Sequence, residues 1–279
     1  MIIRNGLVFR GDGFEEKDLS FEDGIITDVA PHGSKTGASY DAQGAYVVPG
    51  FVDIHTHGCM ICDFCDVSSA DIERIMALCG NQGVTSIALT AVSYGDNTLK
   101  KILHVAQPYL GKKGYGASLR IGESFDKTEY VEMICDGALF HPSVVRAMFK
   151  RFGAQRVCLV SYRSRSTEMA DGEYAFVGYT AAKNGGQTNP VNGGGTAQSA
   201  MSLTDCFRYA VEIGIPIEDA VRAASYNPAC AVSIASNVGS LVPGKSADIL
   251  VMDSDLKLVD VFIAGERQNA VSSEFGVRS

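Results

Sequence analysis

Residues 47–58 read V-V-P-G-F-V-D-I-H-T-H-G and carry the clearest structural signal in the chain. A short apolar run stops at Pro49-Gly50, a pair typical of turns, and a second run over residues 51–54 ends in His55-Thr56-His57. On a strand, residues i and i+2 face the same side. The stretch therefore predicts a buried strand whose carboxyl end presents two imidazoles to one side.

Downstream, strand and helix patterns alternate. Apolar or β-branched runs predict strands at 84–90, 118–121, 130–135 and 156–161, and helical spacing predicts helices near 71–79, 97–106, 142–152, 201–213 and 217–225. The Gly-, Asn- and Thr-rich residues 181–199 predict a loop. This order predicts an α/β fold with a TIM-like barrel over residues 49–239. A complete barrel takes about 250 residues, whereas residues 46–235 offer five strands, so the predicted barrel is incomplete.

Both ends of the chain read as short strands joined by turns. Asn5-Gly6 and Glu22-Asp23-Gly24 each carry the signature of a hairpin turn, and residues 247–263 again alternate strands and turns. These patterns predict one small β-sandwich domain, formed by residues 1–48 and 240–279.

Composition narrows the class of protein. The 279 residues are 46% hydrophobic and 20% charged, with a net charge of −8, which disfavours a nucleic-acid partner. No apolar run approaches the roughly 18 residues that span a bilayer, and the first residues lack a secretory signal. Eight cysteines in a chain of this size are typical of reduced thiols. We therefore expect a cytoplasmic protein that binds neither membrane nor nucleic acid.

The two imidazoles of His55 and His57 could share one divalent ion. The alternative is a pair of polar residues that end a strand. A catalytic site with three protein ligands would need Glu123, Asp53 or a cysteine as well. The other histidines favour structural roles: His32 lies in a predicted turn, His104 in a predicted helix, and His141 either caps a helix or contacts substrate.

A second possible ligand set follows directly, because Cys59, Cys62 and Cys65 have x2 spacing. Thiolates at that spacing hold zinc or iron–sulfur clusters. The set lacks a fourth cysteine at a matching distance. The reading that we favour is three small, partly buried residues in a loop between strand and helix.

Several segments, in order along the chain, resemble the N-acetylglucosamine-6-phosphate deacetylases of the amidohydrolase superfamily. They are residues 47–58, 130–142 (Y-V-E-M-I-C-D-G-A-L-F-H-P), 171–174, 227–229 and 239–248. The resemblance implies metal-assisted hydrolysis of the N-acetyl group of a phosphorylated amino sugar, with zinc or iron as the divalent cofactor. It further implies His55, His57 and Glu123 as metal ligands, and Thr196, Ala197 and His141 as substrate-binding residues.

The chain departs from the family pattern at three places. Tyr162 stands where the family has its catalytic aspartate, Leu139 replaces a substrate-contacting histidine, and two later histidine ligands fall in a segment that this chain lacks between about residues 116 and 128. We therefore assign no catalytic residue. An alternative to the enzyme is an inactive relative that serves in binding or assembly, and a third hypothesis is a shortened version of a longer active chain. The open edges of an incomplete barrel also predict a homodimer.

Overall fold

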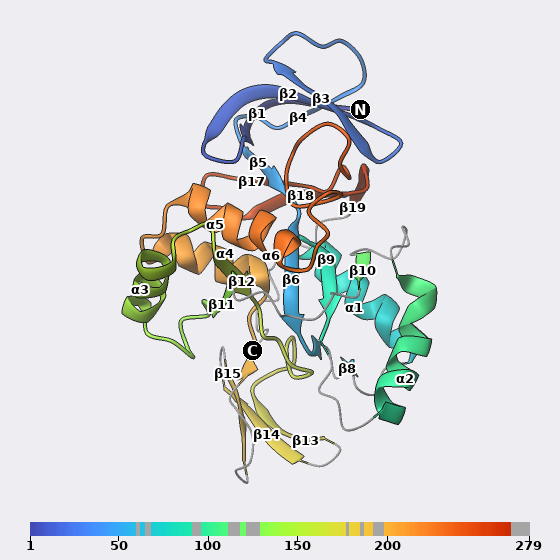
Figure 1. Cartoon of the computed structure of the whole chain (residues 1–279), viewed down its shortest axis with the longest axis vertical. Coiled ribbons are helices and arrows are strands. Elements are labelled where there is room, and N and C mark those ends of the chain that lie inside the picture. The colour runs from blue at the N-terminus through green and yellow to red at the C-terminus, as the bar shows by residue number, and fades with distance from the viewer. Residues whose placement is uncertain are drawn as a thin grey trace.

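The computed structural model describes residues 1–59, 62–64, 68–90, 96–110, 118–120, 129–176, 179–184, 187–191 and 198–268. Figure 1 shows a β-rich layer built from both ends of the chain, a central α/β region below it, and a small antiparallel sheet at the far end. This arrangement confirms the α/β class. None of the helices in the described segments is long and apolar enough to cross a membrane.

Strands from both chain ends form one continuous eight-stranded sheet, where the sequence predicted a sandwich. Along the main path the order is β19-β18-β17-β5-β1-β2-β3, and β4 pairs with β1. The C-terminal β17 lies antiparallel to β5, which joins the two chain ends directly. The strands are β1 (Ile2–Phe9), β2 (Phe14–Glu22), β3 (Ile25–Pro31), β4 (Ser39–Asp41), β5 (Tyr46–Pro49), β17 (Ile249–Met252), β18 (Leu258–Ile263) and β19 (Glu266–Gln268).

Of the two predicted hairpin turns, the structure contains the one at Asp23-Gly24, and the prediction at Asn5-Gly6 is wrong. Asp23 and Gly24 adopt positive φ angles of 49° and 78° in the turn between β2 and β3. At Asn5-Gly6, in contrast, β1 continues without a turn, and its pairing with β2 shifts register between Ile3 and Gly6. The positive φ of Asn5, 55°, therefore serves a bulge within a long strand.

The central region contains five parallel strands among the residues that the structure describes. Strands β10-β9-β6 form one parallel group and β11-β12 another. The groups meet where the Tyr162 N–H donates to the His55 carbonyl (2.9 Å) and the His57 N–H donates to the Arg163 carbonyl (2.8 Å). Five strands are fewer than the eight of a closed barrel. Their bounds are β6 (Phe51–Thr56), β9 (Val84–Leu89), β10 (Ser118–Arg120), β11 (Val131–Ile134) and β12 (Val157–Val160).

Amphipathic helices cover these strands, with α1 and α2 on one side and α3, α4 and α5 on the other in Figure 1. The Ser68 hydroxyl and the Asp71 carboxylate form a capping box at the start of α1. Helix α2 begins at Asp96, one residue before the predicted start at residue 97. The helices are α1 (Ser69–Asn81), α2 (Asp96–Ala106), α3 (Pro142–Phe152), α4 (Leu203–Glu212), α5 (Ile217–Ala224) and α6 (Tyr226–Ala231), with a 3₁₀ turn at Gln107–Tyr109.

The segment predicted as a loop over residues 181–199 instead contributes to an antiparallel sheet. It comprises β13 (Gly172–Phe176), β14 (Tyr179–Asn184), β15 (Gln187–Pro190) and β16 (Gln198–Ser199). The polar composition favoured a loop. These strands form nevertheless, because each pairs with the next strand along the chain, from β13 to β16. A further two-strand ladder, β7 (Gly58–Cys59) with β8 (Cys62–Asp63), follows the histidine pair.

Gly50 joins the end-of-chain sheet to the first central strand and has no room for a side chain. A Cβ placed there would lie 2.1 Å from Oγ1 of the buried Thr85. We expect Gly50→Ala to lower the free energy of unfolding by about 1–3 kcal/mol through overpacking. Gly13→Ala is the matched control because a Cβ at Gly13 meets nothing within 4 Å. Urea unfolding followed by circular dichroism checks this, and equal effects of the two variants would contradict it.

Candidate active site

The structure brings the two histidines of the H-x-H motif together at the carboxyl end of β6. The imidazole centroids of His55 and His57 lie 5.3 Å apart, with their planes at 68°. His57 is 6% exposed and His55 is partly buried. The i, i+2 spacing thus places both rings on one side, as a strand requires.

Tyr162 completes a cluster of three rings. Its centroid lies 4.9 Å from that of His55 and 5.4 Å from that of His57, and both contacts are edge-on. The backbone of Tyr162 has a φ of 52°, a left-handed conformation that costs a non-glycine residue roughly 1 kcal/mol or more. Such strain is typical of functional positions, and here it turns the phenol toward the histidine pair.

Glu132, on β11, contacts this cluster from another strand. Its Oε2 lies 2.5 Å from Nδ1 of His55, and both side chains are about one-third exposed or less, at 30% and 27%. Burial lowers the pKa of His55, but the hydrogen bond and charge of Glu132, with a contribution from Asp53, outweigh it and raise that pKa overall. Because the carboxylate accepts the Nδ1 proton, Nε2 of His55 keeps its lone pair for a further partner.

The Asp53 carboxylate, on β6, forms hydrogen bonds that join β6 to the end of β12. Its Oδ2 accepts from the Ser161 hydroxyl at 2.5 Å, and its Oδ1 accepts from the backbone N–H groups of His55 (3.2 Å) and Ser161 (3.4 Å). Complete burial raises the pKa of Asp53, although the Ser161 hydrogen bond and Arg163 oppose this. With both oxygens engaged in hydrogen bonds, Asp53 holds the ends of β6 and β12 together.

Arg163 is fully buried behind the histidine pair. Its Nη1 donates to Oε1 of Gln82 at 2.6 Å and its Nη2 to the Cys79 sulfur at 2.5 Å. A hydrogen bond from Cys59 lowers the pKa of Cys79, and the positive charge of Arg163 adds to this against the effect of burial. Cys59, the first of the three cysteines with x2 spacing, is therefore hydrogen-bonded to Cys79, which also accepts a hydrogen bond from Arg163.

Among the described residues, His55 and His57 are two side chains that could hold a metal ion. Neutral imidazoles suit a borderline divalent cation such as zinc, and the His55 contact with Glu132 matches the usual support of such a ligand. No group of three or more His, Cys, Asp or Glu side chains able to hold a metal occurs in the described segments. The predicted third ligand Glu123 lies outside the described residues, as do Cys65 and the predicted substrate-binding Thr196 and Ala197.

The other three histidines lie at the start of a helix, on a helix and in a turn. His141 is the N-cap of α3, where its ring accepts from the Ser143 N–H at 3.3 Å, and it is exposed. His104 lies exposed on α2, and His32 lies in a turn beside Asp18. Cys62 donates to the Asp71 carboxylate at 3.3 Å.

We expect Glu132→Gln to weaken metal binding at His55 about 10–100-fold, because the neutral amide no longer raises the basicity of the ring. Glu129→Gln is the matched control, since Glu129 is an exposed residue just before the same strand. Competitive titration with a zinc chelator measures the affinity. Identical affinities for the two variants would show that the Glu132 contact has no part in metal binding.

A match to the Amidohydrolase family covers residues 112–272, more than half of the chain. The chain therefore belongs to the amidohydrolase family, a family of hydrolases. Its resemblance to N-acetylglucosamine-6-phosphate deacetylases is confirmed by relatives of that name. One, from Vibrio furnissii, is 28% identical over 272 residues, covering 92% of this chain and 58% of its own. A putative N-acetylgalactosamine-6-phosphate deacetylase of Escherichia coli K12 is 30% identical over 142 residues, covering 50% and 84%.

Solved structures show the same fold. The N-acetylglucosamine-6-phosphate deacetylase of Pasteurella multocida superposes with a TM-score of 0.83 at 18% identity, covering 96% of this chain and 99% of that one. The Thermotoga maritima enzyme of the same name gives 0.77 at 19% identity. The chain nevertheless spans only 58% of the Vibrio furnissii relative.

Proposed function

We propose that this chain hydrolyses the N-acetyl group of a phosphorylated amino sugar, releasing acetate. The observation that carries the proposal is the His55–His57 pair at the carboxyl end of a parallel strand, supported by Glu132 and packed against Tyr162. Enzymes with parallel β/α cores place their catalytic groups at this end of the strands. The names of the relatives in both sequence and structure favour the deacetylase reaction.

His55 and His57 would hold a divalent metal, with Glu123 as the proposed third ligand. When bound, such a cation would supply polarisation of the acetyl carbonyl and activation of a water. Glu132 fixes the ring orientation and proton position of His55. Tyr162 packs against both rings and offers a phenol hydroxyl that can donate a hydrogen bond. We propose zinc or iron as the metal, and Thr196, Ala197 and His141 as substrate contacts.

Acetate release tests the proposal. The purified chain is stripped with a chelator, reloaded with Zn²⁺ or Fe²⁺, and assayed on N-acetylglucosamine 6-phosphate and N-acetylgalactosamine 6-phosphate. Metal-dependent acetate release from either sugar phosphate, and much less from unphosphorylated N-acetylglucosamine, is the expected result. Absence of both bound metal and acetate release would overturn the proposal and favour the inactive binding or assembly relative.

We also propose that the protein is a cytoplasmic homodimer. Within the described residues, the parallel groups end at β10 on one side and β11 on the other, and such strand edges are usually covered. Sedimentation analysis of the purified chain checks the oligomeric state, and a single monomeric species would contradict the dimer.

A further inference from the structure

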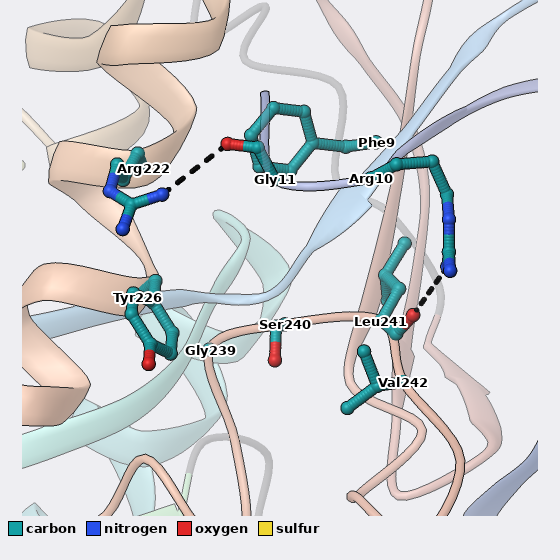
Figure 2. Close-up of a pocket in the computed structure, with 9 residues that line it drawn as sticks. All are labelled: Phe9, Arg10, Gly11, Arg222, Tyr226, Gly239, Ser240, Leu241 and Val242. Atoms are coloured by element: carbon teal, nitrogen blue, oxygen red, sulfur yellow. Dashed lines mark hydrogen bonds between the residues drawn. The ribbon is translucent and has the colours of Figure 1, made fainter. Parts of the chain in front are cut away.

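A cavity of about 260 Å³ lies between the end-of-chain sheet and the helices of the central region. Figure 2 shows its walls: residues 9–11 at the end of β1 on one side, Arg222 of α5 and Tyr226 of α6 on the other, and residues 239–242 below. None of the residues of the histidine cluster lines it. The cavity is therefore separate from the candidate active site.

Two arginines line this cavity, and each donates to a backbone carbonyl within the part of the chain that the structure describes. Arg222 donates from Nη1 to the Gly11 carbonyl at a long 3.4 Å, and Arg10 donates from Nη1 to the Leu241 carbonyl at 3.0 Å (Figure 2). Nε of Arg222 is buried and has no hydrogen-bond partner among the described residues. A buried N–H without a partner is unfavourable, so the Arg222 guanidinium retains capacity for a ligand.

A third positive charge stands behind the cavity wall. Nζ of Lys245 donates to the Ser240 hydroxyl at 2.7 Å and lies 5.5 Å from the centroid of Tyr226, while the Arg222 guanidinium lies 5.2 Å from the same ring. In a chain of net charge −8, three cations gathered around one cavity are notable. Asp219 on α5 offsets part of the Arg222 charge, and the cations that remain favour an anion.

The loop that forms the floor is held in one position. Gly239 has a φ of +83°, and a Cβ there would lie 2.8 Å from Cβ of Ala229 and 3.0 Å from the Ser225 carbonyl. Only glycine permits this close approach of the loop to α6. The cavity is thus preformed, which reduces the entropy lost when a ligand binds.

We propose that this cavity binds a small organic anion, a carboxylate or a phosphate monoester. The charged group contacts Arg222, whose planar guanidinium suits two-oxygen recognition of either anion. Arg10, at the opposite end of the cavity (Figure 2), adds positive charge without sharing that contact. The apolar part of the ligand lies against Leu241 and Val242, which line the same cavity. Because the ligand touches both the sheet and the helices, its binding stabilises their association and raises the unfolding temperature.

Isothermal titration calorimetry with phenyl phosphate, benzoate and neutral benzamide tests the proposal on the full chain. We expect saturable binding of an anion and none of benzamide. Arg222→Gln is expected to weaken binding about tenfold or more, as for loss of a charge-assisted hydrogen bond, and Arg10→Gln, which removes only a more distant charge, is expected to weaken it less. Arg146→Gln is the matched control, because Arg146 is an exposed helical arginine that also bonds a carbonyl, that of Ile213 at 3.1 Å.

A blocking variant covers the case in which Arg222→Gln does not fold. Val242→Phe fills the cavity from a side chain that is 37% exposed and leaves both arginines in place. It should abolish anion binding without loss of fold. Binding by phenyl phosphate alone or benzoate alone identifies the class of anion. No saturable binding, equal binding of benzamide, or binding unaffected by all three cavity variants would overturn the proposal.

The histidine site could bind a phosphate as well, so the titration is repeated on a variant with His55 and His57 replaced by alanine. Anion binding that persists there, and is lost on Val242→Phe, belongs to the cavity. This outcome does not depend on whether the chain releases acetate. Binding lost only with the histidines would assign the anion to the active site and overturn the cavity proposal.

Discussion

Replacing His55 and His57 together with alanine is expected to remove the bound divalent metal and to reduce acetate release by about 10³-fold. Loss of the metal removes several kcal/mol of transition-state stabilisation, and each 1.4 kcal/mol corresponds to about tenfold in rate. The two rings share one side of β6, 5.3 Å apart, so both ligands are lost from one place. Metal analysis of the purified protein and the acetate assay measure the two effects.

His104→Ala is the control for this double variant, because His104 is exposed on α2 and away from the motif. It should retain metal and activity. Circular dichroism of the double variant shows whether the fold survives, and the single variants report on each ligand if it does not. A folded double variant that keeps its metal would show that the cation binds elsewhere.

Sequence reasoning worked where one local pattern dictates the structure. The i, i+2 spacing of His55 and His57 placed two rings on one side of a strand without any knowledge of the rest of the fold. The 3.6-residue spacing of Ile72, Ile75 and Met76 likewise predicted the buried face of α1. Strand period and helix period are properties of the backbone itself, so they can be read from sequence.

Glu132 was missed because its role depends on which strands lie side by side. It is 77 residues from His55 along the chain, and only the approach of β11 and β12 to β6 brings the two together. The signal in the sequence was a charged residue inside the otherwise apolar run of residues 131–134. Burying a carboxylate in a strand is unfavourable unless the carboxylate is paired. On that ground the sequence could have predicted a hydrogen-bonded or charged partner for Glu132.

Tyr162 and Arg163 show the same limit. The family resemblance located Tyr162 at the position of a catalytic aspartate, but its contact with both histidines follows from a backbone φ of 52° that no local pattern announced. Arg163 is 0% exposed, although arginine is among the residue types that are almost never buried alone. Burial of that side chain is decided by tertiary packing against α1.

Arg163→Ala is expected to lower the free energy of unfolding by about 3–5 kcal/mol, the usual cost of removing one partner from a buried charged network. The guanidinium bonds Gln82 and the Cys79 sulfur, and its charge opposes the burial-driven rise in the pKa of Asp53. The variant leaves these groups without their cation and opens a void. Because the chain contains no tryptophan, urea unfolding is best followed by circular dichroism.

Two further variants divide the contribution of Arg163 into its parts: one tests volume against charge, and the other tests a single hydrogen-bond partner. Arg163→Met refills most of the void without the charge, so it should cost less than Arg163→Ala if packing contributes. Gln82→Ala keeps the guanidinium but removes its hydrogen bond to Gln82, together with the exposed bond from Gln82 to Glu168, at an expected cost of about 1.5–3 kcal/mol. Arg146→Ala, on the exposed face of α3, should stay within about 0.5 kcal/mol. If Arg163→Ala were as mild as Arg146→Ala, the buried network would contribute nothing to stability.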